Sequence, residues 1–232
     1  MLFLFDIDGT LLRRMPPAHR QAVCDAIAAV YGAHLTPDAL MRPEDLGQTA
    51  GMTDSAIGWR ALRALGVPDE AIAAGMPAFF AAAAAAYTRH VPADLRPYRT
   101  PHAEETLAWL AARGEALALV TGNVEAIAWT KLRAAHLDHY FACGAFGDEA
   151  IERQRLPPLA LARARATFRR DFAPEQVFVV GDTPADVACG LACGMRSVAV
   201  ATGPVHAVAE LLAAGAHHAC ADLRGLRALD LA

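Results

Sequence analysis

Four short apolar runs, each followed by a loop and a helical pattern, constrain the fold of this chain more than any other feature. The runs span residues 2–5, 116–120, 177–180 and 197–201, with a weaker one near 141–146 and a possible last one near 218–221. Continuous apolar runs of this length are typical of parallel strands buried on both faces. The pattern predicts an α/β fold, a Rossmann-like doubly wound parallel sheet whose ligand site lies at the carboxyl ends of its strands.

The segment that follows the first strand has a different pattern. Helices are predicted between the later strands at 101–113, 125–135, 159–170, 184–193 and 205–214. Between Leu12 and Pro92, however, helical stretches are punctuated by prolines and glycines, and no strand pattern occurs. We therefore expect a small all-helical cap domain at 15–92, inserted into a core domain formed by 1–14 and 93–232. The hinges are expected at 13–15 and 92–99.

Composition excludes several classes of function. The 232 residues carry a net charge of −4 and a pI near 6.1, which argues against partners such as nucleic acid or an anionic membrane. The five cysteines are odd in number and form no CxxC, which is typical of reduced thiols in a cytoplasmic protein. No signal peptide fits the first residues. The most apolar window, 71–87, is expected to be a packed helix because it is short for a membrane span.

The first apolar run ends on two carboxylates. Asp6 and Asp8 lie two positions apart and lead directly into a turn at Gly9. Two like charges at the end of a buried strand are costly unless a cation lies between them. Mg²⁺ meets this need, because it prefers carboxylate and carbonyl oxygens shared with a phosphate group. An exposed acidic turn is the alternative, and matching residues further along the chain argue against it.

Three later segments carry polar groups at the points where strands end or helices begin. They are Thr121-Gly122-Asn123, the basic pair Arg153 and Arg155, and Gly181-Asp182-Thr183-Pro184-Ala185-Asp186. Together with the first segment they resemble the motifs of the haloacid dehalogenase (HAD) superfamily. The order DxDGT, TGN and GDTPxD is similar to that of its phosphoglycolate phosphatase-like members, which carry a helical cap after the first motif.

The resemblance implies roles that agree with the chemistry of the residues. Asp6 is expected to be the nucleophile that forms an aspartyl-phosphate. Asp8 is expected to donate a proton to the leaving alkoxide and then to accept one from water. Asp6, the backbone carbonyl of Asp8 and Asp182 would hold Mg²⁺, which offsets the repulsion between an anionic nucleophile and an anionic substrate.

Two of these segments also have purely structural interpretations. Thr121 with the amides of Gly122 and Asn123 is expected to bind phosphate at a helix N-terminus. Alternatively, Thr121 or Asn123 is only an N-cap. Asp186 follows Thr183 and Pro184 in a good capping sequence, so we expect it to orient its neighbours, with direct or water-mediated metal contact as the alternative.

The third motif departs from the pattern of many relatives, which carry a lysine followed by proline. Aligning the helix that follows places Arg153 at the lysine position, so Arg153 is expected to bind the phosphate and Asp6. Arg155 is the second candidate. Lys131, the only lysine, is a third candidate. It lies about eight residues into the helix that follows the second strand, roughly 12 Å along it, and this distance argues that it is too far from the site.

The cap segment contains weaker signals. Gly51-Met52-Thr53-Asp54 is similar to a loop that related phosphatases place above the active site; alternatively, Thr53 is an N-cap that starts a helix running through Leu65. His19, Arg20 and Arg42 either contact the far end of a substrate or form a solvated face of the cap.

The sequence therefore predicts a Mg²⁺-dependent phosphatase that hydrolyses a small phosphomonoester metabolite through an aspartyl-phosphate. The alternatives are a phosphomutase of the β-phosphoglucomutase type and a non-catalytic binding module with the HAD fold. We expect a small phosphorylated metabolite as the partner, no nucleic acid, no membrane, and a monomer or homodimer. The letters do not identify the physiological substrate.

Overall fold

Six parallel strands form one sheet in the order β3-β2-β1-β4-β5-β6. The computed structural model describes residues 1–13, 15–40 and 50–229. The strands are β1 (Leu2–Phe5), β2 (Ala116–Val120), β3 (Gly144–Ala145), β4 (Val177–Gly181), β5 (Arg196–Val200) and β6 (His218–Cys220). All six coincide with the predicted runs to within a few residues, and the Rossmann-like α/β fold class is confirmed.

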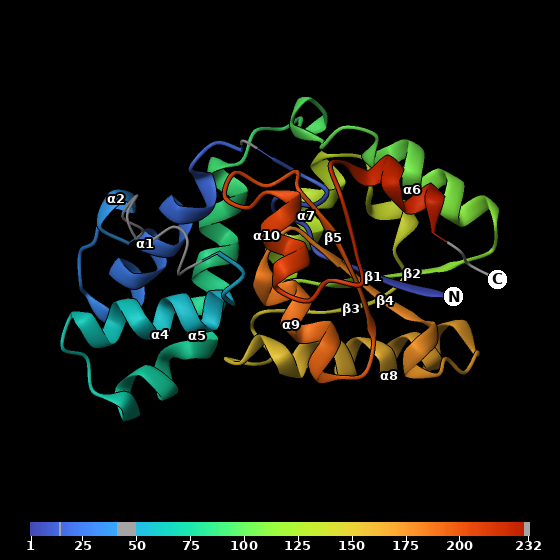
Figure 1. Ribbon diagram of the computed structural model, residues 1–232. Coiled ribbons are helices and arrows are strands. Elements are labelled where there is room, and N and C mark those ends of the chain that lie inside the picture. The colour runs from blue at the N-terminus through green and yellow to red at the C-terminus, as the bar shows by residue number, and fades with distance from the viewer. Residues whose placement is uncertain (14, 41–49, 230–232) are drawn as a thin grey trace.

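The two faces of the sheet are covered by different helices because successive side chains of a strand point to opposite sides. Phe3 and Phe5 of β1 pack on one face in a cluster that includes Leu107 of α6 (Ala103–Ala112) and Leu132 of α7 (Glu125–Ala134). Leu4 packs on the other face, in a cluster with α8 (Leu156–Phe168). Figure 1 shows α6 and α8 on opposite sides of the sheet. The central strand is therefore buried throughout, as its apolar run predicts.

The helices that flank the sheet lie close to their predicted positions. They are α6 (Ala103–Ala112), α7 (Glu125–Ala134), α8 (Leu156–Phe168), α9 (Pro184–Ala192) and α10 (Val208–Ala213). Short 3₁₀ turns lie at Arg96–Tyr98, Asp138–Tyr140, Arg153–Arg155, Pro174–Gln176 and Leu223–Ala228. Helix α8 begins at Leu156, three residues before the expected start. Pro157 and Pro158 occupy its first turn, where a proline leaves no intrahelical hydrogen bond unmade.

Among the residues that the structure describes, four further helices form a group beside the sheet, at the left of Figure 1. They are α1 (Ala18–Tyr31), α2 (Pro37–Leu40), α4 (Asp54–Ala64) and α5 (Asp69–His90). Ile27 of α1, Leu62 of α4 and Phe79 of α5 are fully buried in the cluster that these helices share. No strand occurs among the described residues of this segment. We propose that the group is the cap domain predicted at 15–92.

Helix α5 is longer than its apolar window suggests. It spans 22 residues, and its most apolar 18-residue window has a mean hydropathy of 1.4 with 33% of the window buried. Length and composition alone would thus allow a membrane span, so the expectation that this segment is too short to cross a membrane is wrong. Ile72, Phe79 and Tyr87 are buried on one stripe, and Gly75 leaves no space for a Cβ beside Tyr31 of α1. This stripe is therefore the packed face of a helix within the group.

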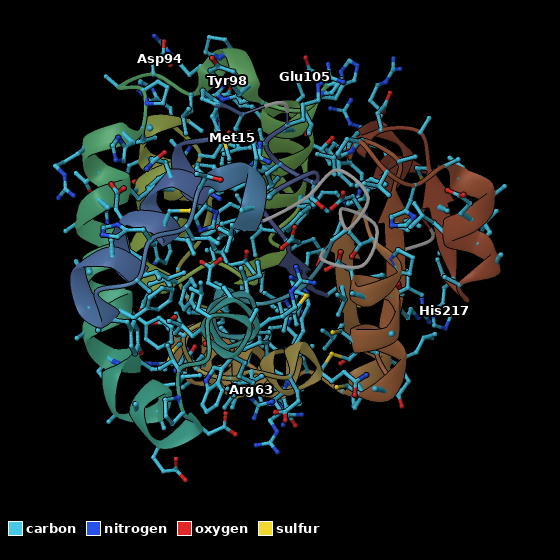
Figure 2. The ribbon with its side chains drawn as sticks, turned by 90° about the vertical axis from the view of Figure 1, so that its left-hand side faces the viewer. Met15, Arg63, Asp94, Tyr98, Glu105 and His217 are labelled. Atoms are coloured by element: carbon cyan, nitrogen blue, oxygen red, sulfur yellow. The ribbon has the colours of Figure 1, made fainter. Side chains whose placement is uncertain are left out.

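The two segments that connect the helical group to the sheet run side by side. The amide of Arg13 donates to the carbonyl of Tyr98 at 2.8 Å, and that of Thr100 donates to the carbonyl of Leu11 at 2.9 Å. Figure 2 views the molecule from the side of the helical group and labels Met15 and Tyr98 near the top. Residue 14, within the first predicted hinge, lies outside the described residues. The hinge positions stay a prediction.

Candidate active site

The loops that follow β1 and β4 bring Asp6 and Asp182 to the same edge of the sheet. The amide of Asp6 donates to the carbonyl of Val180 at 2.9 Å, so the ends of β1 and β4 lie side by side. Gly9 has a φ of +89°, and a Cβ on it would lie 2.1 Å from a carboxylate oxygen of Asp182. A Cβ on Gly203 would meet the same oxygen at 1.8 Å. The Asp182 carboxylate therefore lies in a space that only glycines leave open.

Three buried carboxylates converge here. Oxygens of Asp6, Asp182 and Asp186 all lie within 4.8 Å of one another. Burial, with nearby carboxylates adding to it, raises the pKa of Asp6 to about 7 and that of Asp182 to about 9. Among the described residues, the hydrogen-bonded cation in this cluster of three carboxylates is Arg153, which contacts Asp6 and Asp186. An all-oxygen donor set short of positive charge fits a divalent cation such as Mg²⁺.

Asp186 is held by two sets of hydrogen bonds. Its Oδ2 accepts from the amide and hydroxyl of Thr183 at 3.1 and 2.6 Å, which completes the capping box of α9. Its Oδ1 accepts from Arg153 at 2.5 Å. Of the two alternatives, this geometry favours an orienting role, because both carboxylate oxygens already have partners. Asp182 has fewer partners: among the described residues, its side chain accepts a single weak hydrogen bond, from Thr10 at 3.4 Å.

Arg153 is the cation beside Asp6. Its Nη2 donates to Asp6 Oδ1 at 2.8 Å, and its Nη1 donates to the carbonyl of Gly51 at 3.2 Å. Burial would lower the pKa of Arg153, but Asp186 and Asp6 raise it, so the guanidinium stays charged. Arg155, the second candidate, has a side chain 73% exposed and pairs with Glu152. The geometry thus favours Arg153 over Arg155.

Lys131 reaches the site as well, although its distance along the helix argues against it. Its Nζ donates to Asp8 Oδ2 at 2.5 Å and to Asn123 Oδ1 at 2.6 Å. The expectation of excessive distance is wrong because helical side chains lean toward the N-terminus, and a lysine extends over the preceding turn. Burial would raise the pKa of Asp8, but the ammonium group of Lys131 lowers it below its ordinary value.

Residues 121–123, which follow β2, were expected either to bind phosphate or to provide an N-cap, and the structure agrees with neither expectation in full. Gly122 and Asn123 line the pocket, whereas Thr121 is fully buried and its Oγ1 accepts from Asn123 Nδ2 at 2.7 Å. The N-cap of α7 is Val124, so neither Thr121 nor Asn123 is the cap residue. Direct phosphate binding by Thr121 stays a prediction.

The N-terminus of α7 is instead satisfied by carboxylates from other segments. Asp54 Oδ2 accepts from the amide of Val124 at 2.8 Å, and Asp148 Oδ1 accepts from the amide of Glu125 at 3.0 Å. Acidic groups at a helix N-terminus are favourable because the free amides carry partial positive charge. Sequence reasoning missed both carboxylates as partners of α7, since neither is adjacent to the helix that it caps.

Both interpretations of the Gly51–Asp54 segment hold in the structure. Thr53 is the N-cap of α4, and its Oγ1 accepts from the amide of Ala56 at 3.1 Å. The same hydroxyl donates to the carbonyl of Ile151 at 2.9 Å, across to the core. Gly51 and Met52 line the pocket. The segment therefore starts a helix and also covers the carboxylates.

A pocket of ≈ 400 Å³ opens between the sheet edge and the helical group. Its core side carries the polar groups described above: Asp6, Asp8, Asn123, Arg153, Asp182 and Asp186. Its other side includes Met15, Pro17, His19, Arg20 and Ile57. His19 and Arg20 thus lie where the far end of a substrate was expected. Arg42, named with them, lies outside the described residues.

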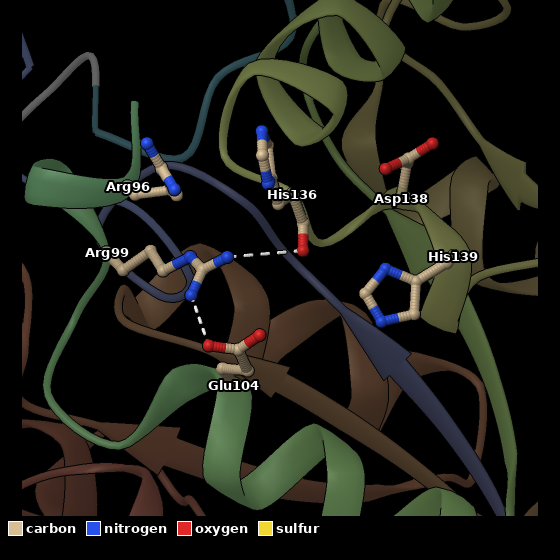
Figure 3. Close-up of a pocket in the computed structure, with 6 residues that line it drawn as sticks. All are labelled: Arg96, Arg99, Glu104, His136, Asp138 and His139. Carbon is tan, nitrogen blue, oxygen red and sulfur yellow. Dashed lines mark hydrogen bonds and ion pairs between the residues drawn. The ribbon is translucent and has the colours of Figure 1, made fainter. Parts of the chain in front are cut away.

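A second cavity of ≈ 490 Å³ lies apart from this one, and Figure 3 shows its lining. Arg99 donates to the carbonyl of Ala135 at 2.7 Å and to that of His136 at 3.2 Å, and it pairs with Glu104. Because α7 ends at Ala134, Arg99 supplies hydrogen bonds where the helix leaves carbonyls unpaired. Arg96 pairs with Asp94. These partnered charges indicate a structural role.

Comparison with known proteins agrees with the motifs. Residues 1–194 match the family of haloacid dehalogenase-like hydrolases. The chain belongs to this family. It is 28% identical over 209 residues to phosphoglycolate phosphatase 1 of Pseudomonas aeruginosa, covering 88% of this chain and 71% of that protein. This hydrolase of the HAD family is thus also similar in sequence to a phosphatase.

Solved structures share the fold over almost the whole length. A hydrolase from Pseudomonas syringae superposes with a TM-score of 0.65 at 20% identity, covering 98% of this chain and 96% of the other. A protein assigned as a beta-phosphoglucomutase from Bacteroides vulgatus gives 0.63 at 23% identity, covering 98% and 86%. At these identities the likeness concerns the HAD fold alone.

The residues that sequence reasoning undervalued in this HAD-family site are Lys131 and its neighbours from the helical group. One signal was present: Lys131 falls on the same face of α7 as the buried residues Ile127, Ala128 and Leu132. A lysine on an apolar stripe is rarely buried without a partner. His19 and Asp54 carried no comparable signal, because their partners lie far away in sequence.

Proposed function

We propose that the chain is a Mg²⁺-dependent phosphatase that hydrolyses a small phosphomonoester. One observation carries the proposal: Asp6 is hydrogen-bonded to Arg153 and lies close to the buried carboxylate of Asp182, in a pocket that Asp8 also lines. A nucleophile, a guanidinium, a place for a cation and a second carboxylate for proton transfer are together what phosphoryl transfer needs.

In the first step, a carboxylate oxygen of Asp6 attacks the phosphorus atom and the ester P–O bond breaks. The product is an aspartyl-phosphate on Asp6 and a departing alkoxide. Asp8 gives a proton to that alkoxide and becomes a carboxylate. Because Lys131 lowers the pKa of Asp8 in the substrate-free protein, Asp8 takes up this proton when the anionic phosphate ester binds beside it. The alcohol then leaves through the open side of the pocket.

In the second step, the Asp8 carboxylate takes a proton from water while the water oxygen attacks the phosphorus atom. The bond between phosphorus and the Asp6 oxygen breaks, which releases inorganic phosphate and restores the Asp6 carboxylate. Asp8 is protonated again, so both carboxylates return to their starting states. Protons and charges therefore balance over the cycle.

Asp6, Asp182 and the backbone carbonyl of Asp8 are the groups proposed to hold Mg²⁺, with Asp186 orienting its neighbours. When bound, the ion supplies positive charge that reduces the repulsion between the Asp6 carboxylate and the phosphate. Arg153 donates to the same carboxylate and offers further N–H groups to the phosphate. Thr121 is proposed to keep Asn123 in place, so that Gly122 and Asn123 face the phosphate.

The proposed substrate is small. The pocket volume is modest, and its outer wall combines apolar groups such as Met15 and Ile57 with the cations Arg13 and Arg20. Similarity to a phosphoglycolate phosphatase supports a phosphorylated metabolite, without identifying which one. A cytoplasmic location and a monomeric or dimeric state are proposed with it, the first because all five cysteines are free thiols.

Hydrolysis of p-nitrophenyl phosphate, with Mg²⁺ and with EDTA, tests the proposal. We expect phosphate release only with Mg²⁺, and none from D6N, because an amide cannot act as the nucleophile. D6N should keep the circular dichroism spectrum of the native protein. Equal rates with EDTA, or full activity of D6N, would overturn the mechanism. Interconversion of two sugar phosphate isomers without phosphate release would indicate a mutase instead.

A further inference from the structure

Lys131 lies at the centre of a buried polar network that joins the core to the helical group. Its side chain is 0% exposed. Besides Asp8 and Asn123, its Nζ has a third partner, the Nδ1 atom of His19 on α1, at 3.1 Å. The ring of Tyr87 on α5 covers the ammonium group, with its centroid 5.7 Å from Nζ. A buried charge is stable only when it is paired and hydrogen-bonded, and this one is.

Donors and acceptors in the network match one to one. An ammonium group has three N–H donors and no acceptor, and Lys131 directs one at each of Asp8, Asn123 and His19. His19 Nδ1 must therefore accept, which assigns the proton of the neutral ring to Nε2. That nitrogen lies 3.0 Å from Asp54 Oδ2 and donates to it. The chain of contacts thus runs from Asp8 to a carboxylate of the helical group.

The two oxygens of Asp8 have different surroundings. Oδ2 accepts from Lys131 Nζ at 2.5 Å and from Asn123 Nδ2 at 2.8 Å. Among the described residues, no hydrogen bond reaches Oδ1. The side chain is 41% exposed and lines the pocket. One oxygen is therefore anchored, and the other is the one available to a substrate.

We infer that Lys131 is a positioning residue for Asp8, and that His19 extends this role to the helical group. By anchoring Oδ2 together with Asn123, Lys131 directs Oδ1 toward the leaving oxygen of the ester. The inference rests on the proposed phosphatase activity, in which Asp8 gives its proton to the leaving group. It concerns how that carboxyl is aimed and which elements aim it.

The helical group contributes to this arrangement from three elements. His19 on α1 accepts from Lys131, Tyr87 on α5 covers it, and Asp54 on α4 binds both His19 and the amide of Val124 at the start of α7. Lys131 is on the same helix α7, two turns further along. Movement of the helical group away from the sheet would remove the contributions of His19, Tyr87 and Asp54, and the ammonium group would keep only Asp8 and Asn123 as partners.

The test compares two substrates that differ in their need for a proton. Ethyl phosphate releases a strongly basic alkoxide that must be protonated, whereas p-nitrophenyl phosphate releases a weakly basic phenolate. We expect K131M to lower kcat for ethyl phosphate about 10²-fold, within the usual range for general acid catalysis, and to lower kcat for p-nitrophenyl phosphate much less. R133M, an exposed cation on the same helix, should change neither.

A second pair of variants separates positioning from folding. In a D8N background, K131M should leave the ratio of the two rates unchanged, because Lys131 acts through Asp8. If K131M does not fold, H19L carries the test, since it removes one partner of Lys131 and keeps a side chain of similar size. H19L should shift the ratio in the same direction by a smaller factor.

Equal losses for both substrates in K131M and H19L would show that the network is only structural and would overturn the inference. A further shift of the ratio in the D8N background would also overturn it. Both outcomes leave the proposed function intact. Failure of the proposed function looks different: the native protein would then release phosphate from neither substrate with Mg²⁺.

Discussion

Replacing Arg153 by methionine should destabilise the metal-free protein strongly at alkaline pH. Arg153 is 9% exposed and touches two buried carboxylates, Asp6 at 2.8 Å and Asp186 at 2.5 Å. Removing one partner of a buried ion pair costs about 3–5 kcal/mol, and here the change leaves two carboxylates without their shared cation. For a chain of this size, that cost corresponds to a fall in Tm of about 6–20 °C.

The pH dependence of this loss follows from Asp6. Burial raises the pKa of Asp6 to about 7 even with Arg153 beside it. Below pH 7 the carboxyl group is increasingly protonated, so Arg153 loses an ionised partner and its removal matters less. The difference in free energy of unfolding between native protein and R153M should therefore grow as the pH rises from 5 to 8.

Thermal unfolding with EDTA at pH 5 and pH 8 measures this difference, and R155M is the matched control. Arg155 is two residues away, but its side chain is 73% exposed and paired only with Glu152, so R155M should change stability by about 0.5 kcal/mol or less. Activity with Mg²⁺ should be lost in R153M and kept in R155M. A loss in R153M that is below about 1 kcal/mol, or equal at the two pH values, would refute the reasoning.

Two further predictions concern the space that a cation would occupy. G9A should lower activity by about 10²-fold or more, because the new Cβ would displace the carboxylate of Asp182. G66A is the control: Gly66 has a similar φ of +79° with nothing within 4 Å, so this change should reduce stability alone. Equal activity of the two variants would contradict the prediction. Metal-free protein should lose stability as the pH rises from about 4 to about 9, since the native pKa values of Asp6 and Asp182 are raised to about 7 and about 9 from 3.8. The Tm gain from added Mg²⁺ should increase over the same range, and a gain that is constant with pH would indicate binding elsewhere.

Four strands could be predicted because each coincides with a continuous apolar run. Strands β3 and β6 have weaker patterns, but they also lie near the expected residues. The residues at which helices begin were harder to predict. Helix α8 starts earlier than expected because prolines fit a first helical turn as well as they fit the loop before it. The alternative that Thr121 or Asn123 caps α7 was wrong, because the first amides of α7 bind carboxylates that lie 70 and 23 positions away in sequence. Local patterns contain no information about such partners.

In the candidate site, Asp6 and Asp182 come together as their positions at strand ends predict, and Arg153, which precedes helix α8, lies beside Asp6. Lys131 shows the limit of this reasoning. A distance measured along a helix axis ignores the direction of the side chain, and a lysine directed toward the helix start spans much of that distance. The partners of Lys131 in the helical group could not be predicted, because they depend on how two separately packed units face each other.

Each of the two cations of the site, Arg153 and Lys131, contacts both a proposed catalytic carboxylate and a residue of the segment proposed as the cap. Arg153 contacts Asp6 and also donates to the carbonyl of Gly51, while Lys131 contacts Asp8 and also donates to His19. Gly51 and His19 both belong to the helical group, so each proposed catalytic carboxylate is linked to that group through its own cation. A cap that opened would therefore loosen both carboxylates at once. Closure over a substrate would both exclude water and restore the two contacts, which makes the arrangement of the nucleophile and of the proton donor depend on the same movement.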